Sequence, residues 1–370
     1  MLEPYEPPDL AAVAASSGLR VEQLIRLDAN ENPFGPSPRV ARALAEYPDY
    51  GFYPDYLPLR QAVARYAGVA PVQVILSNGA DEMIDLLIRL FVEPGQAIVT
   101  CPPTFSMYGI FARVNRCQVL SVPRRGDFSL DVAAITATVE ASDGNARILF
   151  LVSPGNPDGQ AIPLNTIREL LALPLIVAVD ETYIEFGGET TVPLLPDHDN
   201  LIVIRTFSKW AGLAGLRLGY ALSFCHSRES GNPPSPGLTG WLERIRAPYN
   251  VNAAAMVAAM ATLEDLETVQ SNVSRLTAER ERLRESLAAL TWIEPLPSQA
   301  NFILCRLKDR TGQDVVSGLA KRGILVRGFS DPTMAEYVRI GVGRPEQNET
   351  LLTALRELGG EYVGQTTSER

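Results

Sequence analysis

A lysine set among hydroxyl-bearing residues and glycines is the most reactive feature of the sequence. Lys209 follows Thr206 and Ser208, and Arg217 lies further along the same glycine-rich stretch. A lysine amine can form a Schiff base with an aldehyde, and hydroxyls beside an arginine fork are groups that hold a phosphate. An isolated lysine is usually a solvated surface residue. The stretch therefore predicts a cofactor site only if the other groups of such a site occur elsewhere in the chain.

Two further polar residues follow apolar runs of the sequence. Asn156 comes shortly after the run 148–152, and Asp180 ends the run 175–180. Lys209 itself follows a third apolar run. Ligands bind at the carboxyl ends of the strands in an open α/β sheet, so we expect these side chains to meet at one sheet edge. Singly, such an Asn or Asp is often a turn residue or a helix cap, but together with the lysine they favour a site.

Pyridoxal phosphate carries both an aldehyde and a phosphate, and its needs match the side chains available. Its ring nitrogen takes a carboxylate partner, for which Asp180 is the candidate. Its phenolic oxygen takes hydrogen-bond donors, and Asn156 and Tyr183 are the candidates. Tyr108, expected to open a helix after a strand, offers an aromatic face for the ring. The stretch 77–82, between an apolar run and a helical pattern, offers a helix N-terminus for the phosphate.

Several motifs carry a resemblance to a known family. In these motifs the sequence resembles the fold-type I pyridoxal-phosphate aminotransferases and, among these, the histidinol-phosphate aminotransferases. The resemblance extends over almost the whole chain. The resemblance implies an α/β fold with a mostly parallel central sheet, helices on both faces of that sheet, and a smaller α/β lobe. The motifs are 27–38, 53–55, 78–82, 153–157, 180–183, 206–220 and 338–342.

The resemblance also implies a role for each candidate residue of the cofactor site. Lys209 holds the cofactor and moves the α-proton of the substrate, and Asp180 and Tyr183 are the other catalytic residues. Tyr53 contacts the cofactor phosphate of the other subunit, which implies an obligate homodimer. The cofactor contacts implied within one chain are Ala80, Asp81, Tyr108, Asn156, Asp180, Tyr183, Thr206, Ser208, Lys209 and Arg217.

The substrate end is assigned by the same resemblance. Arg339 is expected to grip the phosphate of histidinol phosphate or the carboxylate of glutamate, with Arg327 as a second phosphate arginine. Tyr5 and Asn32 resemble residues of the substrate mouth. A bidentate arginine suits either anion. Without the resemblance, each arginine is equally well interpreted as a surface guanidinium on a strand.

The implied activity is pyridoxal-phosphate-dependent transamination of histidinol phosphate with 2-oxoglutarate, which gives imidazole-acetol phosphate and glutamate in histidine biosynthesis. Tyr5 and Tyr53 also suit an aromatic side chain, so an aromatic-amino-acid aminotransferase is an alternative. A decarboxylase of threonine phosphate is another, because the sequence does not show which substrate bond is cleaved. A non-catalytic binding protein on this fold is disfavoured by the intact Lys209 and Asp180.

The sequence departs from the family pattern at two places. The usual Ser-Pro-Asn-Asn-Pro-Thr-Gly reads Ser-Pro-Gly-Asn-Pro-Asp-Gly at 153–159. Asn156 is kept, but we expect a looser turn before it. The segment 223–237 is rich in Pro, Ser and Gly. We interpret it as an inserted, disordered surface loop without a site, because loop insertions cost little free energy and occur at exposed tips; His226 within it is expected to be solvated.

Composition restricts the remaining classes. The net charge of −10, without a dense basic patch, argues against nucleic-acid binding. Two histidines and four scattered cysteines predict no metal site, and reduced thiols indicate a cytoplasmic protein. No apolar run is long enough to span a membrane, and the first residues lack the features of a signal peptide.

The expected organisation follows the alternation of strand-like and helix-like patterns. Residues 1–38 form a mostly irregular arm that joins the small domain, and 39–240 form the large cofactor-binding domain with its inserted loop. Residues 241–358 form a linking helix and the small C-terminal domain, with a long helical stretch over 241–290. Residues 359–370 form a polar tail.

Overall fold

The computed structural model describes residues 8–224 and 237–360. At its centre lies a seven-stranded sheet of order β2-β8-β7-β6-β5-β3-β4. Strand β8 runs antiparallel to both of its neighbours, and the other neighbouring pairs are parallel. The predicted α/β fold with a mostly parallel central sheet is confirmed. The strands are β2 Val74–Ser77, β3 Ala97–Thr100, β4 Gln118–Ser121, β5 Ala146–Val152, β6 Ile176–Asp180, β7 Leu201–Thr206 and β8 Gly219–Ser223.

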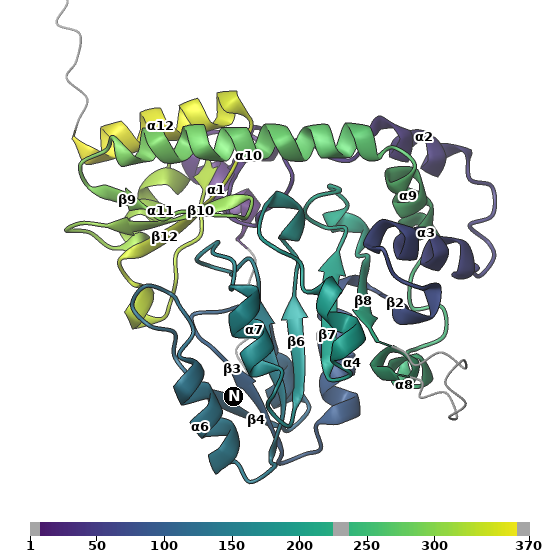
Figure 1. Cartoon of the computed structure of the whole chain (residues 1–370). Coiled ribbons are helices and arrows are strands. Elements are labelled where there is room, and N and C mark those ends of the chain that lie inside the picture. The colour runs from purple at the N-terminus through teal and green to yellow at the C-terminus, as the bar shows by residue number, and fades with distance from the viewer. Residues whose placement is uncertain (1–7, 225–236, 361–370) are drawn as a thin grey trace, which may run out of the picture.

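Helices cover both faces of this sheet (Figure 1). Val177 and Val179 of β6 pack into a core that includes α3, α6, α7 and α9, whereas Ala178 faces the opposite core with α4, α5 and α8. Strands buried on both faces are continuous apolar runs rather than alternating ones, which is why the sequence showed them as runs. The helices are α3 Leu57–Ala67, α4 Gly79–Phe91, α5 Met107–Val114, α6 Val132–Ala141, α7 Leu164–Leu170, α8 Gly237–Ile245 and α9 Ala253–Leu263.

A smaller antiparallel sheet of order β12-β10-β9 forms a second core. Two of its strands, at 302–307 and 337–341, coincide with short apolar runs of the sequence, and the third strand, at 293–295, is only three residues long. The helices α11 and α12 pack with it, so this part is the smaller α/β lobe that was expected. Its elements are β9 Ile293–Pro295, β10 Phe302–Leu307, α11 Gly312–Ala320, β12 Tyr337–Gly341 and α12 Pro345–Gly359.

The helical stretch over 241–290 is broken into α8, α9 and α10, and α10 spans Leu266–Ala288. The break after α8 has a local cause: Pro248 follows, and Asn252 caps α9 by accepting a bond from the backbone N–H of Ala255, since proline ends helices and Asn is a favoured cap. Helix α10 runs along the top of the molecule from α9 to the small sheet (Figure 1). The long helical stretch expected over 241–290 is therefore divided into three helices.

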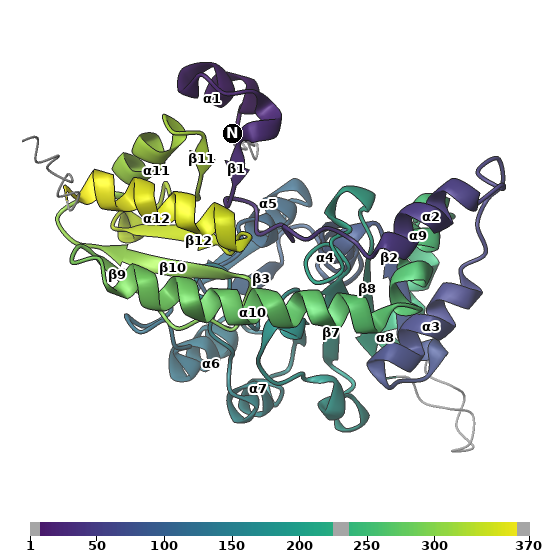
Figure 2. The ribbon, with the colours of Figure 1, turned by 90° about the horizontal axis from the view of Figure 1, so that it is seen from above.

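The N-terminal arm is more regular than predicted. It contains α1, Leu10–Ser17, and β1, Ile25–Arg26, which pairs in parallel with β11, Ile324–Leu325. Figure 2 shows the chain after β1 crossing from this lobe to α2, Pro38–Glu46. The crossing segment therefore passes between the two sheets.

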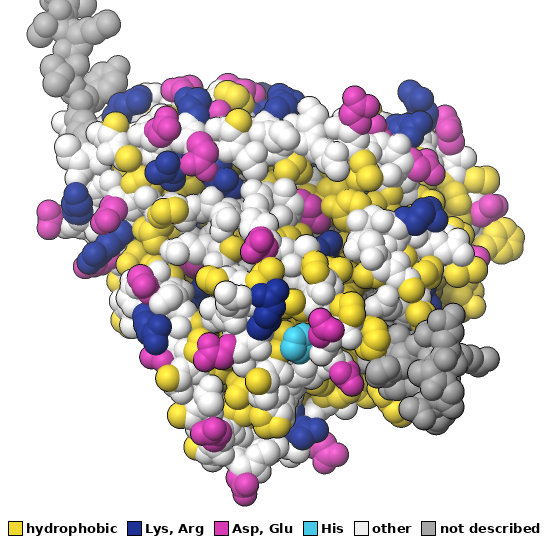
Figure 3. Space-filling view, in the orientation of Figure 1, with side chains coloured by type: hydrophobic (Ala, Val, Ile, Leu, Met, Phe, Trp, Pro, Cys, Tyr) yellow, Lys and Arg dark blue, Asp and Glu magenta, His cyan; other side chains and the backbone are white. Residues whose placement is uncertain are grey.

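On the face shown in Figure 3, acidic and basic side chains are interspersed over the described residues. Within those same residues, no helix has the length and apolar character needed to cross a bilayer.

Candidate active site

The polar residues predicted at strand ends lie around one cavity of about 150 Å³. Asp180 is the last residue of β6, and Asn156 and Lys209 follow β5 and β7. They meet because β5, β6 and β7 are neighbouring parallel strands whose carboxyl ends share one edge. The cavity is lined by Ala80, Asp81, Phe105, Val152, Asn156, Asp180, Thr182, Tyr183, Thr206, Ser208, Lys209, Ala214 and Arg217.

The amine of Lys209 is held inside the protein and is easily deprotonated. Its Nζ donates a hydrogen bond to the carbonyl oxygen of Ala29 at 2.9 Å. Burial, followed by the positive charge of Arg339, lowers the pKa of Lys209 to about 8. Only a neutral amine attacks an aldehyde, so this environment prepares Lys209 for Schiff-base formation near neutral pH.

Asp180 lines the same cavity and is 4% exposed. Its carboxylate accepts hydrogen bonds from the backbone N–H of Thr182 at 3.0 Å and from the hydroxyl of Tyr108 at 2.7 Å. Burial raises the pKa of Asp180, and the bonds from Thr182 and Tyr108 oppose that rise. A buried carboxylate held by donors is suited to pair with a cationic ring nitrogen.

The structure corrects the aromatic wall of the cavity. Tyr108 is fully buried beneath Asp180, its ring stacks on Phe150 with centroids 4.8 Å apart, and it does not line the cavity. Phe105 lines the cavity instead. The reason is helix phase: α5 begins at Met107 and turns Tyr108 toward the sheet, whereas Phe105 precedes the helix in the loop at the strand ends. Tyr108 therefore lies outside the lining of the cavity in which it was expected to stack on the cofactor ring.

A cradle for a phosphate lies at the N-terminus of α4. Gly79 begins this helix with a φ of +80°, and a Cβ there would lie 2.7 Å from Nη2 of Arg217. Arg217 also contacts the Asp81 carboxylate at 2.7 Å. The hydroxyls of Thr206 and Ser208 lie 2.9 Å apart beside this helix end. First-turn amides, hydroxyls and a guanidinium are donors that a phosphate takes.

The donor set fits pyridoxal 5′-phosphate. An amine, a buried carboxylate and a phosphate cradle line one cavity, and an aromatic ring forms part of its wall. Gly79 in the phosphate cradle supports this fit, because a side chain at position 79 would displace Arg217, which closes the cradle. Within the described residues, no cluster of three or more His, Cys, Asp or Glu side chains is placed to hold a metal.

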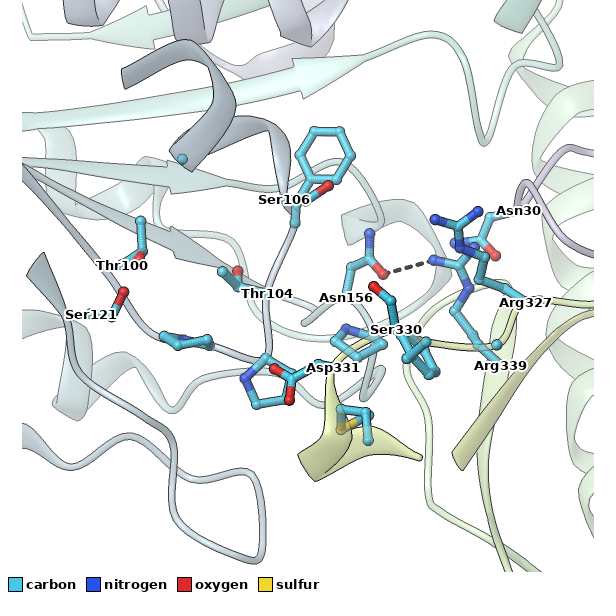
Figure 4. A pocket seen from close by; sticks show the side chains of 18 of the residues that line it. Asn30, Thr100, Thr104, Ser106, Ser121, Asn156, Arg327, Ser330, Asp331 and Arg339 are labelled. Atoms are coloured by element: carbon cyan, nitrogen blue, oxygen red, sulfur yellow. Dashed lines mark hydrogen bonds between the residues drawn. The ribbon is translucent and has the colours of Figure 1, made fainter. Parts of the chain in front are cut away.

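A larger cavity of about 520 Å³ adjoins Lys209 and contains both substrate-end arginines. Arg339 Nη1 donates to Oδ1 of Asn156 at 2.8 Å (Figure 4), which leaves the amide nitrogen of Asn156 as the donor for a phenolic oxygen. Arg327 and Arg339 are held side by side by two backbone hydrogen bonds of 3.0 and 2.8 Å. Figure 4 shows Thr100, Thr104 and Ser121 at the other end of this cavity.

Asn32 was expected at the substrate mouth, and the structure places it elsewhere. Its side chain donates to the carbonyl oxygen of Trp210 at 3.0 Å and accepts from the backbone N–H of Phe34 at 3.0 Å, so it fixes the arm. It lines neither cavity, whereas Asn30 lines the larger one. Both asparagines lie in one motif, and no sequence signal distinguishes them; in the structure, Asn30 takes a positive φ and Asn32 does not.

Two predicted residues cannot be placed within one chain's site. Tyr5 lies outside the described residues. Tyr53 is 79% exposed and stacks on Tyr249 with ring centroids 4.2 Å apart, away from both cavities. Its proposed contact with a second subunit stays a prediction. Of the expected inserted loop 223–237, residues 225–236, including His226, lie outside the described residues; Ser223 ends β8 and Gly237 begins α8.

The turn before Asn156 is tight, not loose as expected. Gly155 N–H donates to the carbonyl of Gln160, and Gly159 N–H donates to the carbonyl of Gly155, both at 2.8 Å. Asp158 is fully buried and pairs with Arg124 at 3.3 Å. A Cβ at position 155 would clash with the carboxylate of Asp158. Gly155 and Asp158, the two residues of this motif that differ from the usual family pattern, therefore compensate each other sterically.

Comparison with known proteins gives a consistent result. Residues 22–355 match the family described as Aminotransferase class I and II. The chain is 45% identical over 372 residues to the histidinol-phosphate aminotransferase of Roseiflexus castenholzii, with 96% of each covered. It is 41% identical over 366 residues to the chloroplastic histidinol-phosphate aminotransferase of Nicotiana plumbaginifolia, with 96% of this chain and 84% of the relative covered.

Among solved structures, the histidinol-phosphate aminotransferase from Sinorhizobium meliloti in complex with pyridoxal-5′-phosphate aligns with a TM-score of 0.86 at 27% identity. The alignment covers 97% of this chain and 96% of that chain. This likeness confirms the fold-type I architecture expected from the sequence. The chain therefore belongs to the class I and II aminotransferases and, within that family, to the histidinol-phosphate aminotransferases.

Proposed function

We propose that the protein catalyses transamination of histidinol phosphate with 2-oxoglutarate, using pyridoxal 5′-phosphate and serving histidine biosynthesis. The observation that carries the proposal is the position of Lys209. Its amine borders both the cofactor-sized cavity and the larger cavity that holds Arg327 and Arg339. The cofactor supplies an electron sink for the carbanion formed at the substrate. The protein supplies binding, orientation and proton transfer.

Lys209 provides the base. With the cofactor bound, Lys209 would hold its aldehyde carbon, and once released its Nζ would act as the base that takes the α-proton of the substrate and later returns it. Burial and the charge of Arg339 keep the pKa of this amine near 8, so a much larger fraction of it is neutral at physiological pH than of an ordinary lysine amine. A base whose pKa lies near the working pH is unprotonated in a useful fraction of molecules and still accepts a proton strongly enough to drive the transfer.

Three side chains orient the cofactor ring. Asp180, held by Thr182 and Tyr108, would pair with the ring nitrogen of the bound cofactor and keep that nitrogen protonated. Asn156 and Tyr183 line the same cavity and offer donors to the phenolic oxygen. The cofactor phosphate is held at the N-terminus of α4.

The two arginines define the substrate class. Arg327 and Arg339 line the larger cavity together with Lys209, so a substrate carrying its amine at Lys209 places an anionic group between two guanidinium forks. A phosphate dianion uses both forks, and the carboxylate of glutamate in the second half-reaction uses one. This arrangement supports histidinol phosphate as the amino donor.

We also propose a homodimer, in which Tyr53 reaches the cofactor phosphate of the second subunit. Exposed large apolar side chains gather in the stretch 50–57 and at Tyr249, beside a groove of about 510 Å³ between α2, α3 and α9. Exposed apolar patches mark interaction surfaces. Sedimentation of the native protein and of Tyr53→Ala at several protein concentrations tests this proposal. The native protein should form a stable dimer, and a monomer at every concentration would contradict the assignment.

The domain division stays a proposal as well: an arm over 1–38, a large domain over 39–240, and a linking helix with the small domain over 241–358. The separate cores of the two sheets support it. The three cysteines that the structure describes are buried and free, and this supports a reducing compartment such as the cytoplasm.

A spectral half-reaction tests the proposed activity. The loaded protein is mixed with one amino donor at a time, and the visible absorbance of the bound cofactor is followed. Histidinol phosphate should abolish the band at low concentration, phenylalanine should do so weakly, and 2-oxoglutarate should restore it. Reaction with phenylalanine alone would indicate the aromatic aminotransferase. Carbon dioxide release from threonine phosphate without consumption of 2-oxoglutarate would indicate the decarboxylase.

A further inference from the structure

The N-terminal arm supplies hydrogen-bond partners to functional side chains of both lobes. The carbonyl oxygen of Ala29 accepts the bond from Lys209, and the carbonyl oxygen of Asp28 accepts a bond from Nη2 of Arg339. Figure 2 shows that this part of the chain runs between the small lobe and α2. The arm is therefore part of the active-site wall rather than a peripheral extension.

Asn30, the next residue of the arm, contacts the site through its side chain. Its Nδ2 donates a hydrogen bond to the hydroxyl oxygen of Tyr183 at 3.1 Å. Asn30 is 2% exposed, borders the larger cavity and lies near Arg339 and Asn156 (Figure 4). The contact is thus a buried bond between an arm residue and a residue of the cofactor cavity.

The backbone at Asn30 is held in a conformation that aims this amide. Its φ is +53°, in the left-handed region that non-glycine residues adopt uncommonly. Its carbonyl oxygen accepts a bond from Nδ2 of Asn301 at 2.9 Å, and Asn301 is 2% exposed. A strained backbone that is fixed by its surroundings is a reason to look for a function of the side chain it carries.

The direction of the bond matters for chemistry. A hydroxyl group has one hydrogen and two lone pairs. The bond from Asn30 uses a lone pair of the Tyr183 oxygen and does not consume its hydrogen. We propose that Asn30 is a positioning residue, whose amide fixes the Tyr183 phenol so that its hydroxyl hydrogen is directed to the phenolic oxygen of the cofactor. This inference rests on the proposed function, because it assigns a role toward that cofactor.

The test is a pH titration of the visible absorbance of the loaded protein in Asn30→Gly. Glycine accepts the positive φ, so this change deletes the amide without adding backbone strain. A donor to the phenolic oxygen favours its ionised form and lowers the titration midpoint. Loss of Tyr183 orientation should therefore raise the midpoint by about 0.5 unit, and Tyr183→Phe should raise it by about 1 unit.

Two further variants distinguish a positioning role of Asn30 from a general structural role. Asn32→Ala removes a buried asparagine of the same motif that bonds to Trp210, and it should leave the midpoint unchanged. The double variant of Asn30→Gly and Tyr183→Phe should titrate like Tyr183→Phe alone. A midpoint in Asn30→Gly equal to that of the native protein would overturn the inference, and so would a shift that persists undiminished when Tyr183 is already Phe.

A second readout does not depend on the cofactor. Urea unfolding of the cofactor-free single and double variants should show non-additive losses, because the two side chains share a bond. Additive losses would overturn the contact itself. Failure of the proposed function would give a different result. No visible band that depends on Lys209 would then develop in the native protein or in any variant. The unfolding measurements would still show whether Asn30 and Tyr183 interact.

Discussion

The hydroxyl of Tyr108 lies 2.7 Å from Oδ2 of Asp180 and donates a hydrogen bond to it beneath the floor of the cofactor cavity. The tyrosine therefore supports the carboxylate from below, while Phe105 provides the aromatic wall above. The two aromatic residues near the start of α5 thus have different tasks, although the sequence pattern pointed to Tyr108 alone as the stacking candidate. The division of tasks between Tyr108 and Phe105 can be measured.

Tyr108→Phe should lower kcat/KM about tenfold. The substitution keeps the ring packed on Phe150 and removes a hydrogen bond to a charged group, which is worth about 1.5–3 kcal/mol. Phe105→Leu is the matched control: it should weaken cofactor retention about 3- to 10-fold through lost stacking and leave the Asp180 bond in place. Steady-state kinetics at saturating cofactor and equilibrium dialysis distinguish the two. Equal cofactor affinities in both variants would contradict this division.

Schiff-base formation at Lys209 should accelerate as pH rises through about 8. Burial and the charge of Arg339 lower the pKa of this amine to about 8, so its neutral, reactive form grows over that range instead of near pH 10. The rate of recombination of cofactor-free protein with pyridoxal phosphate, followed by absorbance between pH 7 and pH 10, measures this midpoint. Arg339→Gln should move it upward; a midpoint above pH 10 in the native protein would refute the assignment.

Asp158→Ala should destabilise the protein by about 3–5 kcal/mol, because it leaves the buried Arg124 without its carboxylate. Gly155→Asn should also destabilise it, through the clash with Asp158, and Asp158→Thr should relieve part of that second loss. Urea unfolding of the single and double variants measures both effects. Strictly additive effects of Gly155→Asn and Asp158→Thr would show that the two departures from the family pattern are independent.

Glu185 should make stability fall as pH rises from about 4.5 through about 7. Burial raises the pKa of this partly buried carboxyl to about 7, and the charge of Arg205 opposes the rise. The folded state then binds more protons than the unfolded state in this window, so stability is highest below it and is lost across it. Glu185→Gln should remove a pH-dependent difference on the order of 1–2 kcal/mol. A constant difference between the native protein and the variant over this window would contradict the shift.

Much of the central sheet and the cofactor edge could be predicted from the sequence. Strands buried on both faces are uninterrupted apolar runs, and the residues after them, such as Asn156 and Asp180, must share the carboxyl edge. The remaining assignments depended on the direction in which individual side chains point. Whether Tyr108 or Phe105 faces the cavity depends on where α5 begins, which patterns locate only to within a few residues.

The arm shows the same limit. Asn30 and Asn32 lie in different surroundings: Asn30 has a left-handed backbone whose carbonyl oxygen accepts a bond from Asn301, whereas the side chain of Asn32 donates to the carbonyl oxygen of Trp210. The separation into α8, α9 and α10 had local signals in Pro248 and Asn252, which the broad helical pattern concealed.

The most direct test of the claim that the chemistry is centred on Lys209 is borohydride reduction of the loaded protein followed by peptide mass spectrometry. Borohydride fixes a Schiff base as a stable amine at the residue that carries it. The arrangement of the cavity predicts one pyridoxyl adduct, at Lys209, and no adduct in Lys209→Ala. An adduct on another lysine, or an unchanged adduct yield in Lys209→Ala, would contradict the assignment.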